Sequence, residues 1–195
     1  DIYNKIKQIS NQCLVGVIGN PLFANEILSL ADEKKDEAKT SSDLMNLVEN
    51  AYHCVREQKI VRGALRQYGF SSLKEVTQPQ QNALVDPSVR EHILSVITDK
   101  GGDYFGLELV LAFCLEKPSL YRIRFPGCGT LENNVKMYSV AGSGSIMAID
   151  KMGEELEKYK WMNELTIEQG IELLMRAGRA SEKHIGVGGP FEITY

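Results

Sequence analysis

A small set of residues in this chain has the type and the setting that chemistry on a substrate requires. Lys5 opens a short strand-like segment and could supply an ammonium group there. Ser143 and Gly144 belong to a Gly-Ser-Gly-Ser turn between a strand and a helix, and Gly19 ends another strand. Each also has a purely structural explanation, as a surface lysine, a helix cap or a glycine turn. The elements that position these residues must therefore decide between the two interpretations.

The cysteines point to no other kind of site. Cys13, Cys54, Cys114 and Cys128 form no CxxC pair and show no spacing to histidine that is typical of zinc. Cys13 and Cys114 fall in apolar strand-like runs, which predicts buried free thiols, whereas Cys128 falls in a predicted loop. Neither a metal nor an organic cofactor is indicated, so the predicted chemistry depends on side chains and backbone alone.

The bulk composition is that of an ordinary folded domain. With 195 residues, of which 43% are apolar and 25% charged, we expect one domain over 1–195 with a core that needs no disulfides. The net charge of -4 offers no basic face for phosphates, so nucleic acid is not an expected partner. No apolar run approaches the roughly 20 residues of a membrane helix, and no signal peptide is evident. Unpaired cysteines fit a reducing compartment, and we expect a cytoplasmic protein.

Runs of apolar and β-branched residues between turn-forming residues predict a series of strands. The predicted strands cover 5–9, 13–18, 104–115, 120–125, 135–141 and 191–195. The strand over 104–115 is apolar on both sides, which is typical of a strand that is covered on both faces.

Apolar residues at helical spacing predict the remaining elements. One helix follows the cap Asn20 and Pro21, and a second follows Ser41-Ser42-Asp43 and continues to Gln67. Further helices are predicted over 89–97, 145–159 and 167–181, the last opened by a capping box of Thr166 and Gln169. A polar stretch at about 70–90 is predicted to be an insertion. This order of elements favours an α+β fold, a four-layer αββα sandwich of two mostly antiparallel sheets.

The ordered set of segments resembles the proteasome β-type subunits and the related bacterial and archaeal N-terminal-nucleophile (Ntn) hydrolases. The segments that carry the resemblance are the 5–9 strand, the strand end at 17–19, the 108–115 strand, the 142–145 turn and the helix start at Leu165 and Thr166. The resemblance implies a threonine-type peptidase whose nucleophile is the first residue of the mature chain. Asp1 cannot play that part, and the family's first two strands do not precede Lys5. We therefore expect these strands and the nucleophile to lie upstream of Asp1.

The resemblance assigns a role to several residues. Lys5 would provide the ammonium that favours a neutral terminal amine, and the backbone amide of Gly19 would bind the oxyanion. Ser143 would contact the terminal amine, with Gly144 beside it. The implied pocket for the substrate side chain consists of small or neutral residues and predicts no strong preference for charge. Its residues are Val17, Pro21 and Asn25.

Two departures near the end of the chain leave the activity open. His184 stands where the family has an Asp, and Val187 stands where it has a Ser. His184 could replace the Asp as a base or orienting group, or it could be a solvated loop residue. Two hypotheses follow: a peptidase acting on peptide or protein substrates, and a non-catalytic subunit that keeps the fold as an assembly or interaction module. For either one the resemblance implies a homo-oligomeric ring or stacked ring.

Overall fold

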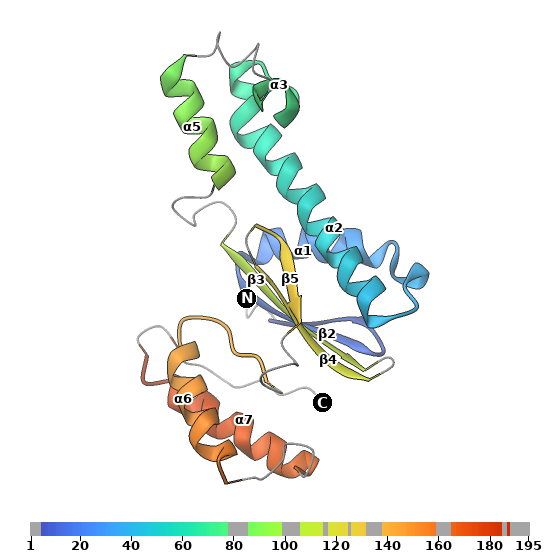
Figure 1. Cartoon of the computed structure of the whole chain (residues 1–195), viewed down its shortest axis with the longest axis vertical. Helices are drawn as coiled ribbons and strands as arrows, with labels where there is room; N and C mark the ends of the chain where they lie inside the picture. Colours follow the sequence, from blue (N-terminus) through green and yellow to red (C-terminus); the bar gives the residue numbers. More distant parts are fainter. Residues whose placement is uncertain are drawn as a thin grey trace.

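A computed structural model describes residues 5–77, 86–98, 106–114, 117–124, 126–131, 138–158, 165–184 and 187. An antiparallel sheet forms the centre of the molecule. In Figure 1 this sheet lies between the helices α1 and α2 above it and the helices α6 and α7 below it. The helices α3 (Leu73–Thr77) and α5 (Pro87–Thr98) lie at the upper end, away from α6 and α7.

The sheet contains five described strands in the same order as in the chain. They are β1 (Ile6–Ser10), β2 (Cys13–Gly19), β3 (Leu107–Cys114), β4 (Pro118–Arg124) and β5 (Cys128–Leu131). Val15 pairs with Leu111, and Leu111 pairs with Tyr121, so alternate residues of neighbouring strands share a face. Residues 13, 15 and 17 of β2 and 107, 109, 111 and 113 of β3 are buried on one face. That face carries the main core.

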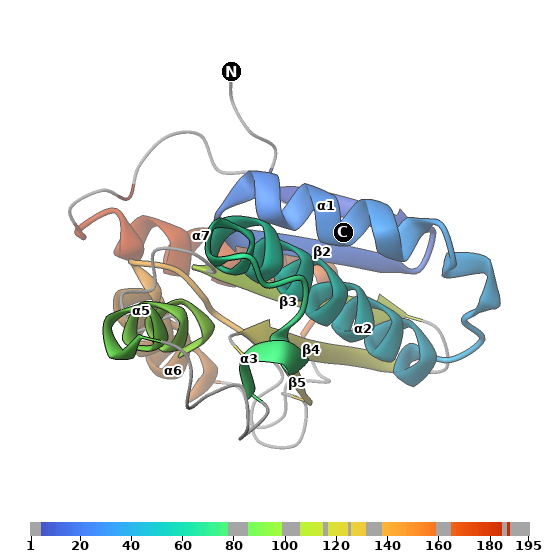
Figure 2. The ribbon, with the colours of Figure 1, turned by 90° about the horizontal axis from the view of Figure 1, so that it is seen from above.

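Helices α1 (Pro21–Asp32) and α2 (Ser41–Ile60) cover the buried face, as the view from above in Figure 2 shows. The Asn20 side chain accepts hydrogen bonds from the Leu22 and Phe23 amides at 3.0 and 3.1 Å, which confirms the predicted cap with Pro21 in the first turn. The cap of α2 differs from the expectation. Thr40 and Asp43 form a capping box, so α2 is capped one residue before the predicted Ser-Ser-Asp run, of which only Asp43 takes part.

The second helix continues beyond α2 into a structure that we call the helical arm, defined as residues 56–77 and 86–98. A π-helical turn, η2 (Val61–Leu65), and a 3-10 turn, η3 (Arg66–Tyr68), prolong α2 to Gly69, whose φ of +83° ends it. Two further helices, α3 (Leu73–Thr77) and α5 (Pro87–Thr98), complete the arm. The end of α2, η2, α3 and α5 each contribute buried apolar residues to the main core cluster: Ile60, Ala64, Leu65, Val76, Ile93 and Val96.

The predicted insertion therefore contains ordered helix in its described part, because 73–77 packs into the arm; residues 78–85 lie outside the described residues. Arg56 Nη2 donates to the Ile97 carbonyl at 2.6 Å and joins α2 to the end of α5. A short 3-10 turn, η1 (Lys35–Glu37), lies between α1 and α2.

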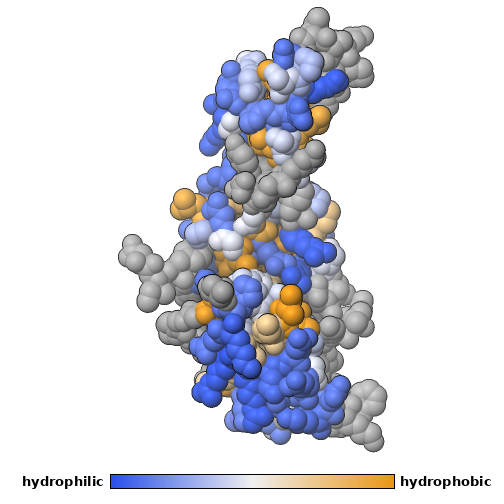
Figure 3. Space-filling model, turned by 90° about the vertical axis from the view of Figure 1, so that its left-hand side faces the viewer, coloured by the Kyte–Doolittle hydropathy of each residue, from blue (hydrophilic) through white to orange (hydrophobic). Residues whose placement is uncertain are grey.

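Helices α6 (Ser145–Leu156) and α7 (Ile167–Ser181) pack on each other around a small second core. This core consists of Ala148, Met152, Leu173 and Ala177, and it is separate from the main core. On the face shown in Figure 3, this lower part of the molecule is largely hydrophilic with a small apolar patch. The capping box of Thr166 and Gln169 is present as predicted.

The coarse fold prediction is confirmed, since the chain is α+β with an antiparallel sheet. A second sheet does not occur among the described residues. The part of the predicted 135–141 strand that is described, 138–141, pairs with no strand there, and the predicted 191–195 strand lies outside the described residues. On the second face of β3, Val110 and Ala112 are half-buried and Cys114 is exposed, so this face is less covered within the described structure than the apolar pattern predicts. Within the same residues, no helix is both long and apolar enough to cross a membrane.

Candidate functional site

A cavity of about 550 Å³ lies at the end of the sheet where β1 begins and β2 ends. It is lined by Lys5, by residues 17–19 of β2, by residues 140–145 with Ala148 at the start of α6, and by Ser181 and Val187 at and beyond the end of α7. These stretches are far apart in the chain. The folded structure therefore brings the first strands and the last two helices together around one space.

Five of the eight residues given a possible role in the site line this cavity, Lys5, Val17, Gly19, Ser143 and Gly144, and so does Val187, the second departure from the family. The remaining three do not belong to its lining. Pro21 is the first residue of α1, Asn25 is exposed on the same helix, and His184 is exposed just beyond α7. The predicted side-chain pocket of Val17, Pro21 and Asn25 is thus represented in the cavity by Val17 alone.

Gly19 occupies a position that only glycine fits. Its φ is +96°, and a Cβ there would overlap the Gly106 carbonyl oxygen and lie 2.8 Å from the Gly106 carbonyl carbon. The next amide, of Asn20, donates to that same oxygen at 3.0 Å. The end of β2 is therefore fixed against the residue before β3, and the need for glycine has a steric cause whether or not its amide takes part in chemistry.

The turn that carries Ser143 leads into α6 without a side-chain cap. Gly142 has a φ of +100°, its carbonyl accepts from the Ser145 amide at 3.1 Å, and Gly144 is the N-cap residue. The structural interpretation in which Ser143 or Ser145 caps the helix is therefore wrong. Both residues line the cavity instead, so two hydroxyl-bearing residues stand at the N-terminal end of α6, where the helix dipole favours negative charge.

The charge of the cavity comes from one residue of its described lining. Lys5 is the only ionisable side chain in that set, and no carboxylate accompanies it. Its carbonyl accepts from the Val17 amide at 2.7 Å, which holds Lys5 opposite Val17. The rest of the described lining is uncharged: its larger apolar members are Val17, Ile18, Val140 and Val187, and Ser143, Ser145 and Ser181 bear hydroxyls. A cation in such surroundings favours a group that gains negative charge.

Sequence reasoning missed several lining residues, notably Ile18, Ala148 and Ser181. Ile18 had a usable signal, because alternation along β2 places it on the face opposite to Val17, toward the segment at 142. Ser181 had none. Ser181 is the last residue of α7, whose apolar pattern is that of an ordinary helix. Only the packing of α7 against the start of α6 places it in the cavity.

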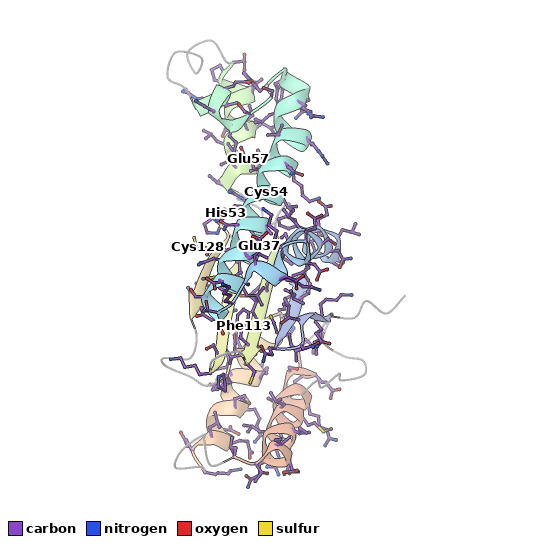
Figure 4. The ribbon with its side chains drawn as sticks, turned by 90° about the vertical axis from the view of Figure 1, so that its right-hand side faces the viewer. Glu37, His53, Cys54, Glu57, Phe113 and Cys128 are labelled. Carbon is purple, nitrogen blue, oxygen red and sulfur yellow. The ribbon has the colours of Figure 1, made fainter. Side chains whose placement is uncertain are left out.

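A cysteine and histidine arrangement elsewhere fails as a rival site. Figure 4 shows His53 on α2 and Cys128 on β5 on the same side of the molecule, and a Cβ on Gly127 would lie 3.1 Å from the His53 ring. Among the described residues, no hydrogen bond joins the His53 ring to the Cys128 thiol. Cys128 begins β5 and does not lie in the predicted loop.

None of the cysteines belongs to the described lining of the cavity. Burial raises the pKa of the Cys13 thiol to about 12, which confirms the prediction that this cysteine is buried and keeps it protonated. Cys114 is exposed, contrary to the prediction, because it is the last residue of β3 and lies at the hairpin end. In the part of the chain that the structure describes, no three His, Cys, Asp or Glu residues are grouped so that they could hold a metal.

The chain finds no match among models of known protein families and none among curated proteins.

Proposed function

We propose that this chain is a proteasome-like N-terminal-nucleophile hydrolase that cleaves peptide bonds, with its nucleophile on a segment upstream of Asp1. One observation carries the proposal. Lys5, Val17, Gly19, Ser143 and Gly144, which the resemblance associates with one active site, come from three separate stretches and line one cavity.

The groups around the cavity suit the chemistry of a terminal hydroxyl or thiol. Such a nucleophile needs a base for its proton, and its own α-amino group can serve if it is neutral. The Lys5 ammonium favours the neutral amine and the developing negative charge. The Gly19 amide stabilises the tetrahedral oxyanion, because no side chain at that position obstructs the approach of a substrate carbonyl. Ser143 holds the terminal amine by a hydrogen bond.

The full fold belongs to the same proposal. A second sheet, containing strands upstream of Asp1, would pack on the half-buried face of the described sheet and complete a four-layer sandwich. The core between α6 and α7 is separate from the main core within the described residues. A second sheet would be the layer that joins the two cores. The assembled form is a homo-oligomeric ring or stacked ring, and sedimentation equilibrium of the purified protein tests this directly.

The non-catalytic alternative has one observation in its favour. Val187, which replaces the Ser of the family, lines the cavity with a side chain that can neither donate nor accept a hydrogen bond. In that version the cavity is inherited with the fold, the protein hydrolyses nothing, and its role is to assemble with or bind other proteins.

Replacement of Lys5 by Met tests the proposal. This change removes the ammonium and retains a side chain of similar length. We expect hydrolysis of a panel of fluorogenic peptides to fall by about 100-fold or more, since the proton transfer that Lys5 assists contributes a factor of that size. Reaction of the N-terminal residue with a hydroxyl-directed or thiol-directed covalent inhibitor should slow in parallel, as measured by intact mass.

Lys34→Met is the matched control, because Lys34 is exposed beyond the end of α1 and is not part of the cavity lining. Its activity should equal that of the unaltered protein. Full hydrolysis by the Lys5 variant would contradict the proposed mechanism. No hydrolysis by the unaltered protein, combined with an unreactive N-terminus, would establish the non-catalytic alternative.

A further inference from the structure

The last turn of α7 touches the turn that begins α6 more closely than side chains normally allow. A Cβ added to Gly144 would lie 2.7 Å from Ser181 Cβ, 3.2 Å from the Ser181 carbonyl oxygen and 3.0 Å from Val187 Cγ2. Real Cβ atoms essentially never approach other atoms closer than 3.0 Å. Gly144 is itself buried, so the contact excludes solvent and cannot relax outward without separating the two helices.

Ser181 makes this contact with its Cβ and its carbonyl oxygen. Its Oγ donates to the Gly178 carbonyl of its own helix at 2.6 Å. That bond turns the hydroxyl along α7 and fixes the side chain. A residue at 181 must therefore be small, and the hydroxyl itself is not what joins the two helices.

The position of Ser181 also determines the position of Val187. The Ser181 carbonyl accepts from the His184 amide at 3.0 Å, and the His184 carbonyl accepts from the Val187 amide at 3.1 Å. Two successive turns thus lead from the end of α7 to the lining of the cavity. Ser143 and Gly144 belong to the same lining, and Val187 lies beside Gly144, since a Cβ there would be 3.0 Å from Val187 Cγ2.

We propose that Ser181 is a positioning residue that fixes how Val187 lies against the turn of Ser143 and Gly144 in the lining of the cavity. The Gly144–Ser181 contact holds one end of the α6–α7 pair. Glu155 holds the pair further along, through Arg176 at 2.9 Å. The importance of this contact for a reaction rests on the proposed function. The contact between Ser181 and Gly144 itself does not depend on that function.

A compensating pair of substitutions tests the contact. Gly144→Ala adds the Cβ that meets Ser181, and Ser181→Gly removes the Cβ that it meets. We expect Gly144→Ala to lower the melting temperature by at least about 2 °C, since overpacking costs about 1–3 kcal/mol and each kcal/mol shifts the midpoint by about 2–4 °C in a chain of this size. The double variant should melt higher than the sum of the two single changes predicts. Ser181→Ala keeps the Cβ and should behave like the unaltered protein.

A thiol at position 143 reports whether a change in the Gly144–Ser181 contact alters the neighbouring part of the cavity lining. With Ser143→Cys in every background, the rate of alkylation at position 143 is followed by peptide mass spectrometry. We expect Gly144→Ala to change this rate at least about threefold and Ser181→Gly to restore most of the change, the pattern of two directly coupled residues. The exposed Cys54 and Cys128 serve as internal controls, and their rates should stay constant. General loosening of the fold would instead accelerate every thiol, including the buried Cys13.

The inference is overturned if the two substitutions add without compensation, or if alkylation at position 143 is the same in all backgrounds. Neither readout involves hydrolysis. A protein that passes these tests and cleaves no peptide would retain the positioning role of Ser181 and lose the proposed function. A protein that fails these tests and cleaves peptides would retain the proposed function and lose the positioning role of Ser181.

Discussion

Gly19 shows how one residue can serve both the fold and the cavity. Its left-handed backbone and its contact with Gly106 make glycine a steric requirement, and the same residue lines the cavity. Gly69 has a similar φ of +83° but has no atom within 4 Å of an added Cβ. A comparison of the two positions therefore separates the cost of a left-handed backbone from the cost of a steric overlap.

Substitution of each glycine by Ala should therefore have different costs. We expect Gly19→Ala to lower the free energy of unfolding by about 3 kcal/mol or more, because strain and overlap add. Gly69→Ala should cost only about 1 kcal/mol, from the left-handed conformation alone. Urea titration of both variants measures the difference. Equal losses would show that the contact between Gly19 and Gly106 relaxes freely.

At the level of single residues, the sequence could indicate which positions meet but not how they are held. The resemblance grouped Lys5, Val17 and Gly19 in one site, and the two strands that carry or adjoin them follow from local pattern. His184 does not reach the cavity because a turn after α7 directs its side chain outward to an exposed position. The absence of a side-chain cap on α6 could not be predicted either, since Ser143 and Ser145 are ordinary capping residues. Gly144 is the N-cap residue instead, and it packs closely against Ser181.

At the level of elements, Glu155 holds α6 and α7 together by charge. Only 5% of the residue is exposed, yet its carboxylate contacts Lys158 at 2.7 Å, Lys151 at 3.0 Å and Arg176 at 2.9 Å. Hydrogen bonds from Lys158 and then Lys151 lower the pKa of Glu155 from its ordinary 4.5 to about 2. A carboxylate surrounded in this way stabilises the fold only while it is ionised.

The pH dependence of this contribution has a defined sign. Because the pKa of Glu155 is lower in the folded state, its contribution is complete above about pH 4.5 and is lost as the pH falls through about 2. Glu155→Gln should therefore destabilise the protein at pH 7 and differ less from the unaltered protein at pH 3, as urea titration at both values will show. The exposed Glu154, which also contacts Lys151, provides the control Glu154→Gln, with a small effect at either pH. A Glu155 effect that grows on acidification would refute this assignment.

The helical arm is a second element whose packing can be tested. Ile93 on α5 is fully buried against the end of α2, whereas its neighbour Leu94 is 51% exposed. The π-helical turn Val61–Leu65 shifts the buried side of the long helix so that Ala64 and Leu65 are also buried in the arm. The arm therefore has the contacts of a folded part and not those of a loose excursion.

Truncation of these neighbours should have unequal effects. We expect Ile93→Ala to lower the free energy of unfolding by about 2–4 kcal/mol, the usual cost of a cavity in a core. Leu94→Ala should change it by less than about 0.5 kcal/mol. Thermal unfolding followed by circular dichroism gives both values. If the two variants were equally stable, the arm would contribute no cooperative packing.

At the scale of the whole molecule, the sequence predicted what local patterns determine. Strands β1 to β4 and the paired helices α6 and α7 were expected close to their observed bounds, because their apolar periodicity and caps are strong. The helical part of the 70–90 stretch was missed, since short polar helices depend on tertiary contacts with α2. The partner of the second sheet face is the part of the fold that remains a proposal.

The central claim is that the cavity receives a nucleophile at the start of the mature chain. The most direct measurement is the intact mass of the purified native protein together with its N-terminal sequence. The proposed function predicts a processed terminus at Thr, Ser or Cys, placed upstream of Lys5 by the length of two strands. A terminus that is blocked or that bears any other residue would contradict the hydrolase and favour the non-catalytic alternative.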